Sequence, residues 1–223
     1  MQIHPSRQSN SQPLPAFGAI KVATGKNCQR GKETSIDIYK LTLKDNAFVN
    51  YLENHTNYKE LLPDMEEVMQ DRWQKVFNYC IRAIKSGDNN SFVAIANNKP
   101  CGILTYYQDE TVSFLDGVCK IPQEKADKIP LIGKTLILNF LKFANKENSK
   151  KVALDAVKDG PIDVISIYEQ LGFKKIFRFC DNKYQPMEMH RFKIKDAIRK
   201  LENVIDYTEA PVKEEINLLN LVG

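Results

Sequence analysis

The chain has 223 residues, a formal net charge of +4 and an estimated pI near 8.7. This length fits one domain with tails, and lysines alternate with acids instead of forming the single basic block that nucleic-acid binding favours. No apolar run approaches the ~20 residues that span a bilayer, and the N-terminus lacks the apolar segment of a signal peptide. We therefore predict a cytoplasmic protein with no membrane and no nucleic-acid partner.

The five cysteines and three histidines predict neither disulfides nor a metal site. The cysteines are scattered, odd in number and without a CxxC pair, which is typical of reduced thiols in the cytosol. His4, His55 and His190 lie far apart, without the spacing of metal ligands. We expect the protein to act without a metal.

The chain opens with a predicted disordered tail, residues 1–34, which contains several serines and has no acidic residue in its first 32 positions. A first strand is expected over residues 35–43. A short helix up to residue 54 follows, with Asp45 as its N-cap. A longer helix over residues 64–85 has one broad apolar face.

The middle of the chain predicts three strands in succession. Residues 92–96 and 102–107 flank a turn at residues 97–100 that contains two asparagines and a proline, which indicates a hairpin. Residues 112–118 form the next expected strand. Gly117 within it is a candidate bulge, because glycine inside a strand often marks one.

Helices and strands alternate in the second half. A helix opens near Gly133, a strand follows over residues 152–157, and a second helix ends at Gly172, where a left-handed residue is favoured. A last hairpin is expected from strands over residues 174–180 and 186–192. The predicted order is therefore β, α, α, β, β, β, α, β, α, β, followed by the second strand of the hairpin.

The main domain is expected to span residues 35–192, and residues 193–223 to form a C-terminal helix with an acidic and then apolar tail. Apolar residues keep helical spacing from Ile194 onward. Two interpretations stand. The helix packs on its own domain, or the segment docks on a partner, which could be a second copy of the chain in a homodimer.

A strand, a loop and a helix N-terminus form a candidate anion site around Gly133. The first-turn N–H groups and the helix dipole favour an anion there, and Gly133 has no side chain to keep a phosphate away. Lys128 and Lys134 add positive charge beside it. The sequence therefore predicts a phosphate-binding loop.

Tyr168 lies on the apolar face of the second helix with Val164, Ile167 and Leu171. Two roles are open. The ring is a core aromatic, or its phenol faces the end of the preceding strand as a catalytic group.

These parts, in this order, resemble the GNAT superfamily of acyl-CoA N-acyltransferases over residues 36–192. The pyrophosphate loop of that family reads Gln or Arg, two residues, Gly, one residue, then Gly or Ala. Lys128, Leu131 and Gly133 stand at these positions. The charge and the last glycine are therefore kept, and the middle glycine is not.

The tyrosine cluster of the same family is better matched. Tyr168, Leu171, Gly172 and Phe173 correspond to its Tyr, Leu, Gly and Phe at the end of the fourth helix. Two positions depart from the pattern, since the frequent asparagine seven residues before the tyrosine is Pro161 here and the alanine four residues before it is Val164.

The resemblance implies an α/β (α+β) fold with a mixed, mostly antiparallel sheet of about seven strands flanked by helices. It implies acetyl-CoA as acyl donor and a primary amine, on a small molecule or a protein, as acceptor. The donor would lie between splayed strands around Val118 and Ala153, with the Val118 amide at the thioester carbonyl. The expected cofactor-binding residues are Val118, Lys128, Ile132, Gly133 and Lys134.

The resemblance makes Tyr168 the acid that protonates the departing thiolate. The attacking amine must be neutral, so a base is needed. Asp116 is the candidate, because it lies two residues before Val118 and so on the same strand face. Glu110 and Asp155 are alternatives.

Two other functions stay open. A non-catalytic acyl-CoA-binding or protein-interaction module on the same fold would explain the departures at Leu131 and Pro161. For nucleic-acid binding, the nearest approach is the basic and aromatic run over residues 174–179. Phe177 and Phe179 alternate there as in a strand, and we expect them in the core.

Overall fold

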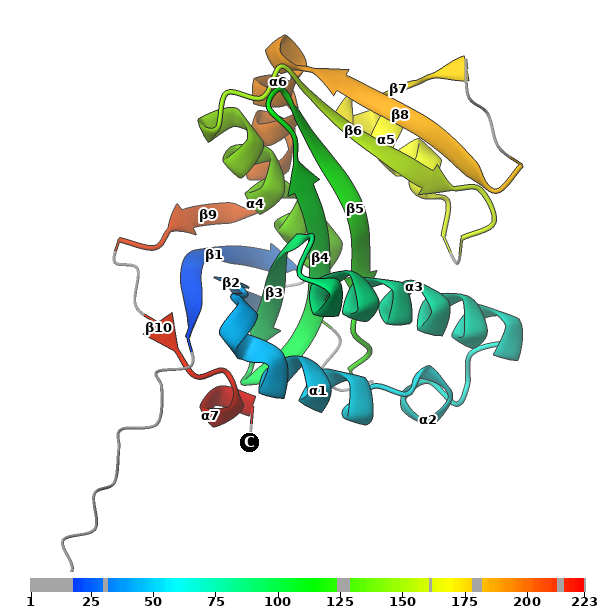
Figure 1. The fold of residues 1–223 in the computed structure, drawn as a ribbon, viewed down its shortest axis with the longest axis vertical. Coiled ribbons are helices and arrows are strands. Elements are labelled where there is room, and N and C mark those ends of the chain that lie inside the picture. The colour runs from blue at the N-terminus through cyan, green and yellow to red at the C-terminus, as the bar shows by residue number, and fades with distance from the viewer. Residues whose placement is uncertain are drawn as a thin grey trace, which may run out of the picture.

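A ten-stranded mixed sheet runs through the computed structural model, with helices on both of its faces (Figure 1). The structure describes residues 18–29, 32–123, 129–160, 162–177, 182–211 and 215–222. The strands are β1 Ala19–Gln29, β2 Lys32–Lys40, β3 Asn90–Ala96, β4 Lys99–Gln108, β5 Val112–Lys120, β6 Lys151–Val157, β7 Lys174–Lys175, β8 Tyr184–His190, β9 Asp206–Glu209 and β10 Glu215–Ile216. The helices are α1 Asn46–His55, α2 Tyr58–Leu61, α3 Glu67–Ser86, α4 Ile132–Lys146, α5 Val164–Leu171, α6 Arg191–Glu202 and α7 Leu219–Val222, with a 3-10 turn at Leu43–Asp45.

The strand order is β10-β1-β2-β3-β4-β5-β6-β8-β7, and β9 also pairs with β1. Among the described strands every pairing is antiparallel except that of β5 with β6, which α4 connects. A parallel pair needs such a crossover. The predicted fold class, a mixed and mostly antiparallel sheet flanked by helices, is confirmed, with ten strands in place of about seven.

Each face of the sheet has its own hydrophobic core. On one face α1, α2 and α3 pack around Phe48, Tyr58 and Phe77, and α7 lies beside α1 (Figure 1). On the other face α4, α5 and α6 pack around Phe140 and Tyr168. The predicted hairpin of β3 and β4 is confirmed, and Asn97 and Asn98 both have positive φ, 52° and 57°, as its tight turn requires.

The predicted disordered tail over residues 1–34 is wrong in its second half. Residues 19–29 form β1, which pairs with β2 along its length, and Ala19 and Ala23 are fully buried. Residues 1–17 lie outside the described part of the chain. The strand was not apparent in the sequence because two of its partners, β9 and β10, lie about 190 residues away.

Asp45 takes the predicted N-cap position of α1, but its side chain makes no capping hydrogen bond to that helix. Thr42 caps the 3-10 turn, and the Asp45 carboxylate accepts hydrogen bonds from the Thr42 backbone N–H at 2.7 Å and from its hydroxyl at 3.0 Å. This reciprocal arrangement is a capping box. Helix α1 starts directly after it.

The predicted C-terminal helix exists as α6 and packs on its own domain through Ile194, Ala197 and Leu201. The tail after it returns to the sheet, where β9 and β10 pair with β1. Leu218 is fully buried in the core of the α1 face. The described part of this tail therefore covers its own domain.

The last hairpin differs most from its prediction. β7 has only two residues, and β8 ends at His190, so Arg191 and Phe192 belong to α6. Phe177 is 77% exposed, and its expected place in the core is wrong. Phe179 lies outside the described residues.

No helix in the described ranges combines the length and the apolar character that crossing a bilayer demands.

Candidate functional site

β5 and β6 separate halfway along their length. They pair only over Val112–Leu115 and Lys151–Leu154, and Figure 1 shows the two arrows diverging beyond that point. We call the unpaired segments, residues 116–120 of β5 and 155–157 of β6, the splay. The expected separation is found at Val118, whereas Ala153 lies in the paired part.

A β-bulge on β5 starts the splay. Thr105 of β4 faces Gly117 and Tyr106 faces Leu115, so Asp116 is the extra residue. A Cβ on Gly117 would lie 2.9 Å from Cys80 Sγ and 3.0 Å from Thr105 Oγ1. Glycine is therefore needed for space at this bulge, since Cys80 of α3 packs directly against the backbone.

Replacing Gly117 by alanine is expected to lower the free energy of unfolding by about 1–3 kcal/mol, the usual cost of overpacking. Gly133→Ala should change it little, because a Cβ on Gly133 meets nothing within 4 Å. Adding Cys80→Ala to Gly117→Ala should make the Gly117 substitution less costly. Urea unfolding of Gly117→Ala, Cys80→Ala, the double variant and Gly133→Ala measures these free energies. If the loss in the double variant equals the sum of the two single losses, the contact between Cys80 and position 117 is contradicted.

The register places the backbone of Val118 at the open edge of β5. The N–H of Ile121 donates to the Cys101 carbonyl of β4 at 2.9 Å. In an antiparallel pair, hydrogen-bonded and non-hydrogen-bonded residues alternate along each strand. The backbone N–H and C=O groups of Cys119 and Gly117 therefore also point to β4, whereas those of Val118 point away from it. The Val118 N–H is thereby directed into the splay.

β6 presents matching groups from the other side. The N–H of Lys158 donates to the Lys183 carbonyl at 2.9 Å, next to the paired β6 and β8. By the same alternation the backbone groups of Asp155 and Val157 point toward β5. An extended chain in the splay can therefore pair with backbone on both sides.

The N-terminus of α4 lies beside the end of β5. A Cβ on Gly102, which pairs with Lys120, would lie 2.5 Å from Ile132 Cγ2, and the Lys120 ammonium donates to the Ile129 carbonyl at 3.4 Å. Ile132 itself is buried, so only its backbone N–H is offered to a ligand. The first-turn N–H groups of a helix have no intrahelical acceptor.

Leu131, which replaces the middle glycine of the family loop, is in the left-handed conformation with φ 60° and ψ 12°. This is the conformation that glycine favours, so the loop keeps the backbone shape that the family pattern predicts. No acid lies in the first turn of α4, Gly133 has open space where a Cβ would stand, and Lys134 is exposed. Lys128 lies outside the described residues.

Tyr168 is buried on α5, with its ring packed edge-on against Phe173 at a centroid distance of 5.5 Å. Asp163 caps this helix by accepting from the Ser166 N–H at 3.1 Å, and Gly172 ends it with φ 108°. Burial raises the pKa of the Tyr168 phenol, and the Cys80 thiol adds to the effect. The phenol therefore stays protonated at neutral pH and lies near the residue that packs on the Gly117 bulge.

Among the described residues, none forms a hydrogen bond with the Tyr168 hydroxyl. The ring therefore packs in the core, one of the two roles that the sequence left open, and the hydroxyl keeps a free donor.

Asp116 does not share a face with Val118, because the bulge breaks the alternation that we assumed. Val118 packs against the core of α4, α5 and α6, whereas the Asp116 carboxylate faces α3. It accepts hydrogen bonds from the Tyr79 hydroxyl at 2.5 Å, the Asn89 amide at 2.7 Å and the Thr105 hydroxyl at 3.2 Å. Three donors engage its oxygens, so Asp116 is better suited to holding α3 and β5 together than to abstracting a proton.

The alternative carboxylates differ in position. Glu110 precedes β5 at its paired end, away from the splay. Asp155 is the first residue of β6 in the splay, and burial raises its pKa. Asp116 and Asp155 each follow directly after the last paired residue of their strand. Burial raises the pKa of Tyr107, and these two carboxylates add to the effect.

The sequence did not reveal the aromatic surface around these carboxylates. Tyr79, Tyr107 and Tyr184 are exposed, and they come from α3, β4 and β8. A hollow of about 490 Å³ next to Tyr79 and Asn89 continues this surface along α3. No spacing in the sequence connects these residues. Within the described ranges, no cluster of three or more His, Cys, Asp or Glu side chains could hold a metal ion.

No protein-family model and no curated protein matches the sequence. Among solved structures, an uncharacterized protein, BH2621, from Bacillus halodurans is similar with 14% identity and a TM-score of 0.53, over 82% of this chain and 98% of that one. The PaiA N-acetyltransferase from Thermoplasma acidophilum in complex with coenzyme A has 21% identity and a TM-score of 0.46, over 70% and 98%. A GNAT family acetyltransferase from Elizabethkingia anophelis with acetyl-CoA bound has 13% identity and a TM-score of 0.44, over 70% and 97%. At these identities the similarity concerns the fold alone.

Proposed function

We propose that this chain is an N-acetyltransferase of the GNAT superfamily that transfers the acetyl group of acetyl-CoA to a primary amine by direct attack. The observation that supports it most is the splay, where the Val118 N–H points into the space between two strands that separate. The N-terminus of α4 lies at the end of the same strand. A thioester site and an anion site therefore adjoin.

The residues of this site fit acetyl-CoA. Its pyrophosphate would lie at the first-turn N–H groups of Ile132, Gly133 and Lys134, where a left-handed Leu131 opens the loop and no acid repels an anion. Its pantetheine arm would pair with the backbone of β5 and β6 like an added strand. Lys128 is proposed to add charge at this loop.

Acetyl-CoA supplies the activated acetyl group, and the chain supplies three groups around it. The Val118 N–H donates to the carbonyl oxygen where negative charge develops. The Tyr168 phenol, kept neutral by burial, donates its proton to the departing thiolate. Asp155, at the start of the splay, is the better placed base, and Asp116 orients α3 beside it.

The amine is proposed to approach from the α3 side of the sheet. Asp116, Asp155 and the exposed rings of Tyr79, Tyr107 and Tyr184 gather there. Carboxylates and aromatic faces both attract an ammonium group. A small amine and a protein amine both fit this open surface.

A non-catalytic acyl-CoA-binding module is the second candidate. The observation in its favour is Leu131, which stands where the family loop has glycine and packs partly buried against the core of the α4 face. It predicts ligand binding without transfer to any amine.

Thermal unfolding with acetyl-CoA tests the binding that both candidates share. At about 100 times its dissociation constant, the ligand should add about 2.7 kcal/mol of stability, which corresponds to a rise in Tm of roughly 5–10 °C for a chain of this size. Adenosine at the same concentration is the control and should give a much smaller shift. No shift with millimolar acetyl-CoA would contradict both candidates.

Release of free thiol in the presence of an amine panel then separates them. Amine-dependent release supports the acetyltransferase. The binding module is supported if acetyl-CoA raises the Tm but no free thiol is released with small amines or with peptides that carry free N-termini and lysines.

A further inference from the structure

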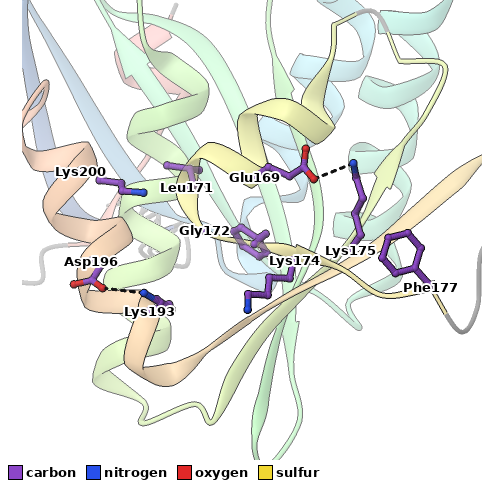
Figure 2. A pocket seen from close by; sticks show the side chains of 10 residues that line it. Glu169, Leu171, Gly172, Lys174, Lys175, Phe177, Lys193, Asp196 and Lys200 are labelled. Carbon is purple, nitrogen blue, oxygen red and sulfur yellow. Dashed lines mark ion pairs between the residues drawn. The ribbon is translucent and has the colours of Figure 1, made fainter.

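A basic groove lies between the end of α5, β7 and α6, on the far side of Tyr168 from the splay. It has a volume of about 700 Å³, and Leu171 and Phe173 contribute apolar surface to it. Lys174, Lys175, Lys193 and Lys200 also line it. Figure 2 shows Lys175 and Phe177 at one end of this groove and Lys193, Asp196 and Lys200 at the other.

The stretch of sequence that contains the groove residues is basic. Residues 164–202 contain nine lysines and arginines and five acids, a net charge of +4 that equals that of the whole chain. Glu169 pairs with Lys175 at 2.9 Å, and Asp196 pairs with Arg199 at 3.2 Å and with Lys193 at 3.8 Å (Figure 2). The Lys200 ammonium donates to the Gln170 carbonyl at 2.9 Å. In the described part of the chain no acid forms an ion pair with Lys174. The groove therefore offers cationic groups to a polyanion.

Two exposed phenylalanines lie close to these lysines in the chain. Phe177 lines the groove, and Phe192, whose ring stacks on His190 at a centroid distance of 6.0 Å, directly precedes Lys193. Phe177 is 77% and Phe192 is 72% exposed, among the highest values for large apolar side chains here. The Ile176 N–H donates to the Pro186 carbonyl at 2.8 Å, so Phe177 lies near the start of β8, whereas Phe192 follows the end of that strand. At about 3.3 Å per residue, the two rings are separated by roughly 15–20 Å.

We propose that the basic groove binds single-stranded nucleic acid. The lysines pair with phosphates, and bases stack on Phe177 and Phe192, the combination by which proteins hold single strands without sequence preference. Lysines alone would suit any polyanion. The exposed rings select nucleic acid over an acidic peptide, because bases present flat π-faces for them to cover.

This inference reverses the expectation drawn from the sequence, which placed Phe177 in the core. It is independent of the proposed acetyl transfer, since the groove lies outside the splay and the α4 N-terminus. The two proposals can therefore fail separately.

Fluorescence anisotropy of a labelled 12-nucleotide mixed-sequence RNA with the full chain tests the proposal. We expect binding that weakens as salt rises from 50 to 200 mM, with a log–log slope of about −2 to −4 for three to five neutralised phosphates. Lys174→Glu with Lys193→Glu should weaken it at least about tenfold. Lys44→Glu with Lys146→Glu, which removes the same charge at exposed sites elsewhere, should stay within about twofold.

The rings are tested separately from the charge. Phe177→Ser and Phe192→Ser should each weaken binding about fivefold or more, and Phe177→Trp should retain it, since stacking tolerates another aromatic. Circular dichroism should be unchanged, because both side chains are exposed.

Three results would overturn the proposal. The first is that RNA fails to bind at ~0.1 mM protein. The second is that the serine variants bind RNA as the wild type does and that polyglutamate displaces the labelled RNA as well as unlabelled RNA does, which would indicate an acidic peptide partner. The third is preferential binding to phosphatidylserine vesicles, which would indicate a membrane surface.

Discussion

Tyr168→Phe should lower the rate of acetyl transfer by about 100-fold or more and leave the affinity for acetyl-CoA and the Tm unchanged. The substitution keeps the ring that packs on Phe173 and removes only the hydroxyl, which forms no hydrogen bond with any described residue. A general acid contributes 10²- to 10⁴-fold, so loss of the proton donor should dominate. Thiol release measures the rate, and thermal unfolding with ligand measures the binding.

Tyr207→Phe is the matched control for that experiment. Its hydroxyl donates to the Asn139 side chain at 2.6 Å, away from the splay. Its removal should leave the rate within about twofold. An equally small effect of Tyr168→Phe would assign Tyr168 to the core alone.

The pH dependence gives a second check on Tyr168. Burial raises its pKa above the ordinary value near 10, so the folded protein keeps the phenol protonated through that pH. The rate should therefore show no alkaline loss from this group below about pH 10. If the rate of the wild type fell near pH 8 and the rate of Tyr168→Phe did not, the phenol would not be neutral at that pH and the assignment would be contradicted.

Gly133→Leu should weaken acetyl-CoA binding by about 30-fold or more without destabilising the free protein. A Cβ at this position meets nothing within 4 Å, so the leucine fits the fold but covers the first-turn N–H groups of α4. Leucine also has a higher helix propensity than glycine, which favours an unchanged or slightly higher Tm. Isothermal titration with coenzyme A measures the loss.

Gly133→Ala provides the graded comparison. The family pattern accepts alanine at this position, and one methyl group leaves most of the approach open. We expect binding within about fivefold of wild type. If Gly133→Leu binds coenzyme A as the wild type does, the pyrophosphate does not lie at this helix.

Elements whose signals are local could be predicted from the sequence. Helix α5 with its stop at Gly172 and the hairpin with Asn97 and Asn98 follow from residues within one turn of each other. The signal for the loop before α4 is also local, and Leu131 in it adopts φ 60°, the left-handed conformation that glycine favours.

Features that depend on distant contacts could not be predicted. Gly117 suggested a bulge, but the alternation along β5 still placed Asp116 on the same face as Val118. The register makes Asp116 the extra residue, and its carboxylate faces α3. The run after Gly172 has the alternation of a buried strand, yet β7 stops after two residues and Phe177 faces solvent.

The three partners of β1 have a consequence for how this protein is made. Its pairs with β9 and β10 join segments about 190 residues apart. Such long-range pairing is slow, because the chain loses the entropy of closing a long loop before the contacts lower its free energy. While the ribosome is still adding residues 206–216, one edge of β1 has no partner, and unpaired edges promote aggregation. The nascent chain therefore carries an exposed edge through most of its synthesis, a period in which chaperone binding would protect it.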